Sequence, residues 1–229
     1  MRNLIASAIA AALCISLSVN AFAATGYATG SARSNDYSPN PTTAQVSATA
    51  KTAIQQAISA NLDTATISLR NATSLSASTI QNIAKQAKEA KVGATIFADK
   101  IEGNSVVTRW YIDPTKATNL TGNLNLEANT DVKSIAQTAG TFTKYFVNDI
   151  AVVSLGQNGS YGMAIGLAIK VDLSKLNTSK LTFFSYDKAT NTFAVIAAPG
   201  YFIDSKGYLH FTTSVGGDIV ITDSSLTKK

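Results

Sequence analysis

The sequence predicts an α+β fold, in which an N-terminal α/β region with two to three helices precedes an antiparallel β-sandwich of Ig-like architecture. In the first half, apolar residues recur every three to four positions, and alternating strand-like segments lie between these stretches. After Phe142 short alternating segments follow one another between Asn, Gly, Asp and Ser. We therefore expect the α/β region over residues 44–139 and the β-sandwich domain over residues 140–225.

The chain begins with the features of a secretory signal peptide over residues 1–23. Arg2 precedes a mainly apolar run from Leu4 to Val19, and small residues stand three and one positions before the expected cleavage after Ala23. A membrane anchor fits less well, because a spanning helix needs about 20 predominantly apolar residues. Lipidation of Cys14 is a further alternative, disfavoured by the large Leu13 before it. We expect a secreted chain with no membrane span after cleavage.

The residues after the signal peptide predict a leader and then the first helix. Residues 24–43 are rich in Gly, Ser, Asn and Pro without an apolar face, which predicts a flexible leader. The helix ends near Asn61, and residues 64–70 alternate as a half-buried strand does. One side of the helix carries Val46, Ala50, Ala53, Ile54, Ala57 and Ile58.

The second helix has sequence signals at both ends. Ser76 is suited to cap its N-terminus, while Leu75 and Ile80 stand where a hydrophobic staple places its two residues. Gly93 suits the left-handed position that ends many helices. We therefore expect a helix whose inward stripe is Ile80, Ile83, Ala84 and Ala87.

Two strands and a connecting turn follow the second helix. Residues 94–99 and 105–112 predict a hairpin. In its second strand Trp110 lies on an apolar face, opposite Arg109 and Tyr111. Further along the chain we expect a strand over 120–126 and a short helix over 131–139.

The second half predicts strands separated by turn residues. The clearest strand is 163–171, where Met163, Ile165, Leu167 and Ile169 alternate with smaller or polar residues. Turn-forming residues fill 157–160, 187–191 and 204–207. The remaining strands are expected over 150–155, 181–186, 192–196, 208–212 and 218–222.

Three segments of this half carry a resemblance to a known group of proteins. They are LTFFSYDKATNTF over 181–193, IDSKGYLHF over 203–211 and GDIVITD over 217–223. They resemble the C-terminal β-module of secreted and cell-surface proteins from clostridia and ruminococci, and SLSASTIQNIAK over 74–85 is similar to an earlier helix of those proteins. The resemblance implies an exported, bacterial, non-catalytic module, often beside carbohydrate-binding or wall-attachment parts. It implies no catalytic residue.

Catalytic and metal-binding chemistry find little support in the sequence. The single histidine, His210, lies in a strand without a nucleophile-elbow pattern, so we expect a solvated histidine rather than a general base. One histidine and no cysteine after cleavage leave too few ligands for a usual zinc site. We expect no enzyme activity, no cofactor and no metal. The alternative of a structural calcium would use turn oxygens among Asp187, Asn191, Asp204, Asp218 and Asp223.

Aromatic residues are the best candidates for binding, because sugar rings stack on flat faces whose polar tips still reach water. Tyr111 shares a strand face with Arg109, and Tyr208 shares one with His210, so both tyrosines are candidates for an exposed position. Tyr201 follows Pro199-Gly200 in a loop. The alternative is that these residues pack at sheet edges or between the two halves.

Composition narrows the range of partners. The chain has a formal net charge of +5 and only 14% charged residues, and its lysines are scattered. No basic run is interleaved with aromatics, so nucleic acid is not an expected partner. We expect an extracellular or cell-surface binding module for a polysaccharide or cell-wall polymer. The alternative is a structural or protein-interaction component of the bacterial cell surface, whose partners are other surface proteins.

Overall fold

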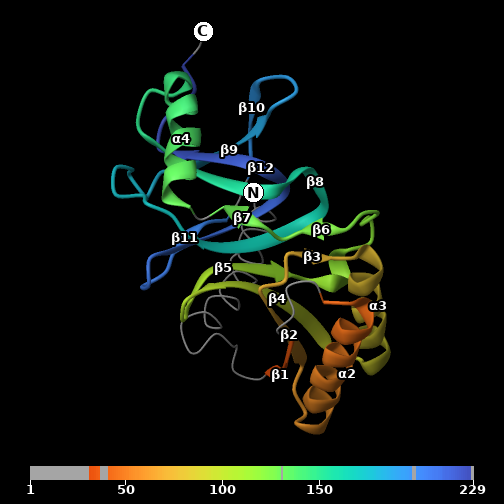
Figure 1. The fold of residues 1–229 in the computed structure, drawn as a ribbon. Helices are drawn as coiled ribbons and strands as arrows, with labels where there is room; N and C mark the ends of the chain where they lie inside the picture. The colour runs from red at the N-terminus through yellow and green to blue at the C-terminus, as the bar shows by residue number, and fades with distance from the viewer. Residues whose placement is uncertain (1–30, 37–40, 130, 198–199, 228–229) are drawn as a thin grey trace, which may run out of the picture.

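The computed structural model describes residues 31–36, 41–129, 131–197 and 200–227, and over these residues the fold is α+β. Three helices accompany a large, mostly antiparallel sheet (Figure 1). The predicted signal peptide over 1–23 lies outside the described residues. The helices are α2 (Thr43–Ser59), α3 (Ala77–Ala90) and α4 (Val132–Phe142), with short 3-10 turns η1 (Pro114–Lys116) and η2 (Thr143–Tyr145).

One sheet runs through most of the described chain. Its strands are ordered β1-β2-β4-β5-β8-β12-β9-β10; β1, β2 and β4 are parallel neighbours, and the other pairs are antiparallel. The bounds are β1 (Ser31–Asp36), β2 (Thr64–Arg70), β4 (Gly93–Glu102), β5 (Ser105–Ile112), β8 (Ile150–Lys170), β9 (Thr182–Asp187), β10 (Thr192–Val195) and β12 (Tyr208–Thr222). Four two-residue strands are β3 (Ser74–Leu75), β6 (Leu124–Asn125), β7 (Ala128–Asn129) and β11 (Phe202–Ile203).

The pairing of β5 with β8 joins the two halves of the chain. Thr108 lies opposite Ile169, and Tyr111 lies opposite Gly166. The sheet therefore continues past the boundary expected between residues 139 and 140. Whether the halves behave as separate domains stays a prediction.

The first helix confirms its predicted apolar face except at Ile58, which lies in the last turn of α2 and is 53% exposed. In α2 the residues Val46, Ala50 and Ala57 are fully buried. A capping box forms at its start, where the Thr42 hydroxyl accepts from the backbone N–H of Gln45 and the Gln45 side chain accepts from the N–H of Thr42. These reciprocal bonds satisfy the N–H groups of Thr42 and Gln45, so the helix starts at Thr43.

The second helix confirms its predicted start but not its predicted end. The Ser76 hydroxyl accepts from the N–H of Thr79 at 3.1 Å, and the staple residues Leu75 and Ile80 are both buried. The left-handed residue is Lys91, with φ of 57°, rather than Gly93. Gly93 begins β4, where an added Cβ would lie 3.2 Å from Thr64 Oγ1. The glycine therefore serves the close approach of β4 to β2.

The expectation of a flexible leader over 24–43 is wrong for residues 31–36. These residues form β1, which pairs in parallel with β2 from Ser31 opposite Thr64 to Asp36 opposite Leu69. The segment SARSND has no apolar alternation. Its strand depends on main-chain pairing at the sheet edge, which side-chain periodicity cannot predict.

In the second half, pairs of predicted strands form single long strands. The segments expected at 150–155 and 163–171 belong to β8, and those expected at 208–212 and 218–222 belong to β12. The turn predicted at 157–160 is instead an irregular region of this pair, with register shifts near Gly216. A Cβ on Gly216 would lie 2.0 Å from the Gln157 carbonyl oxygen, so only glycine fits this bulge.

Two shorter predictions differ in extent. The strand expected over 120–126 is reduced to β6, which pairs with β3 in a separate sheet. The helix expected over 131–139 is confirmed as α4, and it extends to Phe142. The predicted hairpin between β4 and β5 is confirmed, with Gly103 at φ of 59°.

The two largest apolar clusters lie on different parts of the sheet. Helices α2 and α3 lie together beside β2 and β4, whereas α4 lies near β8 and β9 (Figure 1). The larger cluster contains Trp110, whose predicted burial is confirmed by its 1% exposure. The smaller cluster, beneath α4, is formed by Phe142, Phe146, Val152, Phe184 and Val220.

Truncation of a buried isoleucine in β8 tests the strand register. Ile165 is fully buried, so Ile165→Ala should lower the free energy of unfolding by about 2 to 5 kcal/mol. The matched control is Ile58→Ala on α2, which removes the same atoms from a side chain that is 53% exposed and should cost less than about 0.5 kcal/mol. Equal costs in urea unfolding would contradict the register.

Candidate binding site

The structure brings four of the five predicted binding residues to one face of the sheet. Arg109 on β5 and His210 on β12 both lie opposite Ala168 of the intervening strand β8. Tyr111 lies opposite Gly166, where an added Cβ would stand 3.0 Å from the Tyr111 Cβ. Because these β8 residues are small, the Tyr111 and His210 rings approach across them to a centroid distance of 6.3 Å.

Arg109 is held by a buried ion pair. Its Nε and second terminal nitrogen donate to the two Asp99 carboxylate oxygens at 2.5 Å and 2.7 Å. The guanidinium carbon lies 5.0 Å from the centre of the Phe97 ring, and Arg109 is 4% exposed. Breaking such a pair would leave a buried charge uncompensated, so the pair of Arg109 with Asp99 has a structural role in the interior of the protein.

His210 is buried rather than solvated, which corrects the sequence-based expectation. It is 4% exposed, its ring stacks on Phe202 at 4.2 Å, and its Nε2 lies 3.1 Å from Asp204 Oδ2. Burial lowers the pKa of His210, and the contact with Asp204 opposes this effect only in part. Burial works against the charged form of Asp204, but bonds from the Tyr208 N–H and His210 outweigh it and lower the pKa of Asp204.

The three tyrosines are buried or half-buried, in agreement with the alternative that they pack in the fold. Tyr208 is 6% exposed, and its hydroxyl donates to the Val106 carbonyl. Tyr111 is largely buried, and burial raises the pKa of its phenol. Tyr201 packs on Phe183, while its hydroxyl donates to the Thr178 carbonyl and accepts from the Leu181 N–H. Strand alternation predicts the face of the sheet on which Tyr111 and Tyr208 lie, but it does not predict how deeply they are buried.

The cavity beside Tyr111 and His210 is too small for a sugar. Its volume is about 40 Å³, and Gly166, Gly200 and Phe202 contribute to its lining. One water occupies about 30 Å³ in the liquid, so a space of this size has room for about one water-sized molecule and not for a sugar ring. A ligand role for Arg109, Tyr111, Tyr201, Tyr208 and His210 therefore stays a prediction.

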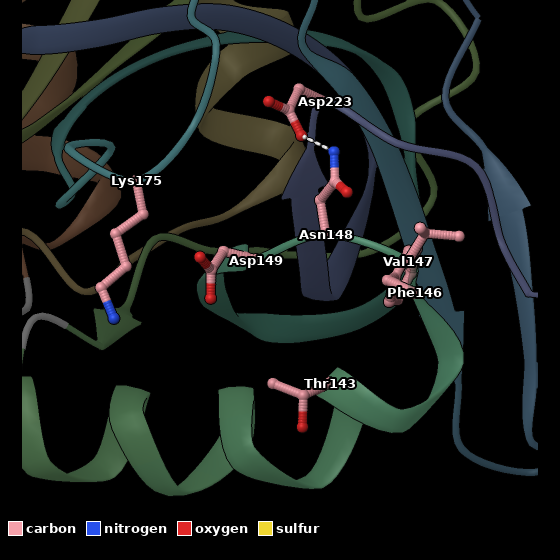
Figure 2. A pocket seen from close by; sticks show the side chains of 7 residues that line it. All are labelled: Thr143, Phe146, Val147, Asn148, Asp149, Lys175 and Asp223. Atoms are coloured by element: carbon pink, nitrogen blue, oxygen red, sulfur yellow. Dashed lines mark hydrogen bonds between the residues drawn. The ribbon is translucent and has the colours of Figure 1, made fainter.

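A much larger pocket lies where α4 passes into β8 (Figure 2). Its volume is about 440 Å³, within the range of about 300 to 1,000 Å³ common for small-ligand sites. Three segments build it: residues 143–149, the connection after β8, and the residue after β12. The lining residues are Thr143, Phe146, Val147, Asn148, Asp149, Lys175 and Asp223.

The C-terminal end of the described chain closes one side of this pocket. The Thr222 hydroxyl donates to the Asp149 carbonyl at 3.0 Å, and Phe146 forms a bridge with Leu226. The Asp223 carboxylate accepts from the Asn148 side chain at 2.9 Å and from the Asn177 N–H at 2.7 Å. The bond from the Asn148 side chain is the main cause that lowers the pKa of Asp223. Asp223 is therefore charged near neutral pH and unsuited to donate a proton as a general acid.

Two charged side chains in the pocket make no hydrogen bond with the described residues, although the pKa of Asp172 is lowered first by a hydrogen bond from the Ser174 N–H and to a smaller extent by the charge of Lys175. Asp149 and Lys175 are exposed, and neither side chain has a hydrogen bond or ion pair within the described part of the chain. Val147 adds an apolar side chain that is 66% exposed, beside the buried ring of Phe146. The pocket thus offers an acceptor, a donor and an apolar surface.

Sequence reasoning missed this pocket except for Asp223, which it named as a turn residue. The sequence signal for this pocket is a set of polar residues at strand ends: Asn148 and Asp149 precede one predicted strand, and Asp223 follows another. Their proximity depends on β8 and β12 pairing in register to Thr222 opposite Ile150. Within the described ranges no three His, Cys, Asp or Glu side chains stand together as metal ligands.

The sequence matches no protein-family model, and the search of curated proteins finds no significant match. The resemblance to clostridial and ruminococcal modules therefore stays a prediction. Among the described residues, no helix has both the length and the apolar character needed to cross a membrane.

The buried histidine predicts a pH effect on stability. Because its folded pKa lies below its ordinary value of 6.5, the unfolded chain binds this proton more readily. This difference in pKa stabilises the folded state. The stabilisation is fully present above pH 6.5, and it is lost as the pH falls toward the folded pKa. When unfolding in urea is measured from pH 8 to pH 5, the free energy of unfolding should fall less steeply for His210→Gln than for the parent chain. The comparison is clean because the chain has one histidine; parallel curves would contradict the assignment.

Proposed function

We propose that the protein is an exported, non-catalytic binding module for a glycan or cell-wall polymer, and that the pocket in Figure 2 holds a sugar unit. The observation that supports this most is the presence of Asp149 and Lys175, both without a hydrogen bond among the described residues, in one open pocket of about 440 Å³.

The chemistry of a sugar suits these groups. A sugar hydroxyl both donates and accepts a hydrogen bond, so it can donate to the Asp149 carboxylate and accept from the Lys175 ammonium. Hydrogen bonds with a charged partner are shorter and stronger than neutral ones. The apolar C–H face of a pyranose can lie against Val147, which is otherwise exposed.

The proposal fits the exported character predicted from residues 1–23 and the resemblance to secreted bacterial modules. For residues 140–225 we also propose the Ig-like sandwich arrangement, which would require the antiparallel sheet to fold over on itself; the register shifts of β8 and β12 near Gly216 support this, because such bulges bend strands. Binding sites at the ends of such sheets are built by loops and strand ends, as this pocket is.

A second candidate function is a structural or protein-interaction role at the cell surface. The observation that favours it is the terminal strand β10, which ends the sheet order and carries Val195 at 63% exposure. An exposed strand edge can accept a further strand from another chain.

Retention on insoluble glycans tests the first candidate. We expect the exported chain, from Ala24 on, to be retained by purified bacterial cell wall or by one of cellulose, chitin and xylan. Asp149→Ala and Lys175→Ala should each weaken retention at least about 10-fold, since each removes a charged hydrogen bond. The matched controls, Asp63→Ala and Lys51→Ala, remove exposed charges of the same kinds outside the pocket and should bind normally.

The outcomes separate the candidates. Retention that all four variants share would exclude the pocket as the site. No retention on any glycan would contradict glycan binding and favour the protein-interaction role. Loss of retention only in the triple variant of Tyr111, Tyr201 and Tyr208 to Ala, with an unchanged midpoint of thermal unfolding, would move the site to the predicted tyrosines.

A further inference from the structure

We infer that Asp223 is the positioning residue of this pocket and fixes Lys175 relative to Asp149; the inference rests on the proposed function. Its two carboxylate oxygens bond to two different walls. Oδ1 accepts from the Asn148 side chain, next to Asp149, and Oδ2 accepts from the N–H of Asn177, two residues after Lys175. One rigid carboxylate thereby spans the two segments that carry the ligand-binding charges.

The connection that carries Lys175 is fixed at two points. Leu173 is 9% exposed and belongs to the larger apolar cluster, and the N–H of Leu176 donates to its carbonyl. On the other side, Asn177 is held through Asp223. Lys175 stands between these two anchors, so loss of the Asp223 contact would release one side of its loop.

The opposite wall is held by the same end of the chain. The N–H of Asn148 donates to the Ser224 hydroxyl at 3.2 Å, while its side chain donates to Asp223. The segment of residues 222–224 therefore orients Asn148 and Asp149 together. A shift of Asp223 changes both walls, and the separation of Asp149 from Lys175 depends on it.

Removing the two hydrogen bonds of Asp223, and exchanging the two partner residues, tests this role. Asp223→Ala removes both acceptors, whereas Asp223→Asn alone could keep both contacts, because the Asn148 amide can turn to present its oxygen. Asn148→Asp alone brings two carboxylates together, which repel. The double exchange, Asp223→Asn with Asn148→Asp, restores a donor–acceptor match at both contacts. It also keeps the net charge of the pair.

The experiment measures glycan retention and amide hydrogen exchange of residues 173–179 in the parent chain, Asp223→Ala, Asn148→Asp and the double variant. The retention probe is the polysaccharide that retains the parent chain. Each single variant should bind at least about 10-fold more weakly and exchange faster over the Lys175 loop. The double variant should return to within about threefold of the parent in both measurements. If Asp223 served stability alone, the single variants would lower the midpoint of thermal unfolding without weakening glycan binding by the folded protein.

The outcomes distinguish a failure of the positioning role of Asp223 from a failure of the proposed glycan binding. Normal binding by Asp223→Ala would overturn the inference. A double variant that recovers slow exchange but not binding would also overturn it, because the charge at 223 would then contact the ligand itself. If the parent chain binds no glycan, the proposed function fails. The exchange data alone then decide: recovery in the double variant supports the positioning role, and no recovery contradicts it.

Discussion

The long antiparallel pairing of β8 with β12 is the interaction on which the rest of the structure depends. It runs from Tyr208 opposite Lys170 to Thr222 opposite Ile150. At one end β8 also pairs with β5, which attaches the parallel strands and the two N-terminal helices. At the other end the pair places residues 148–149 beside residues 222–224, where the larger pocket forms. The fold and the candidate site thus share one element.

The two faces of the β8–β12 pair differ in the kind of side chain that they bury. Leu209 and Phe211 face the apolar cluster beneath the N-terminal helices, while Tyr208 and His210 alternate to the other side. There, the ion pair of Asp99 with Arg109 and the contact of His210 with Asp204 satisfy polar groups that burial would otherwise penalise. The cavity on this face is too small for a sugar, so the ligand site that we propose is the larger pocket.

The sequence predicts the parts of the fold that depend on local patterns. The capping by Ser76, the apolar stripe of α2 and the inward face of Trp110 follow from spacing alone. Strand β1 could not be predicted, because its polar residues pair through the main chain. The glycines near 157–160 indicate turn geometry correctly, but only the partner strand decides that this geometry is a bulge. The pocket escaped prediction for a similar reason: Asp149, Lys175 and Asp223 are distant in sequence and meet through strand register.

The most direct test of the account is an NMR titration of the exported chain with a soluble fragment of the glycan that retains it. The account predicts that amide shifts concentrate at residues 146–149, 173–177 and 222–224, with the Lys175 and Asp149 side chains changing together. Shifts centred on Tyr111 and His210, or along the β10 edge, would contradict the assignment of binding to this pocket.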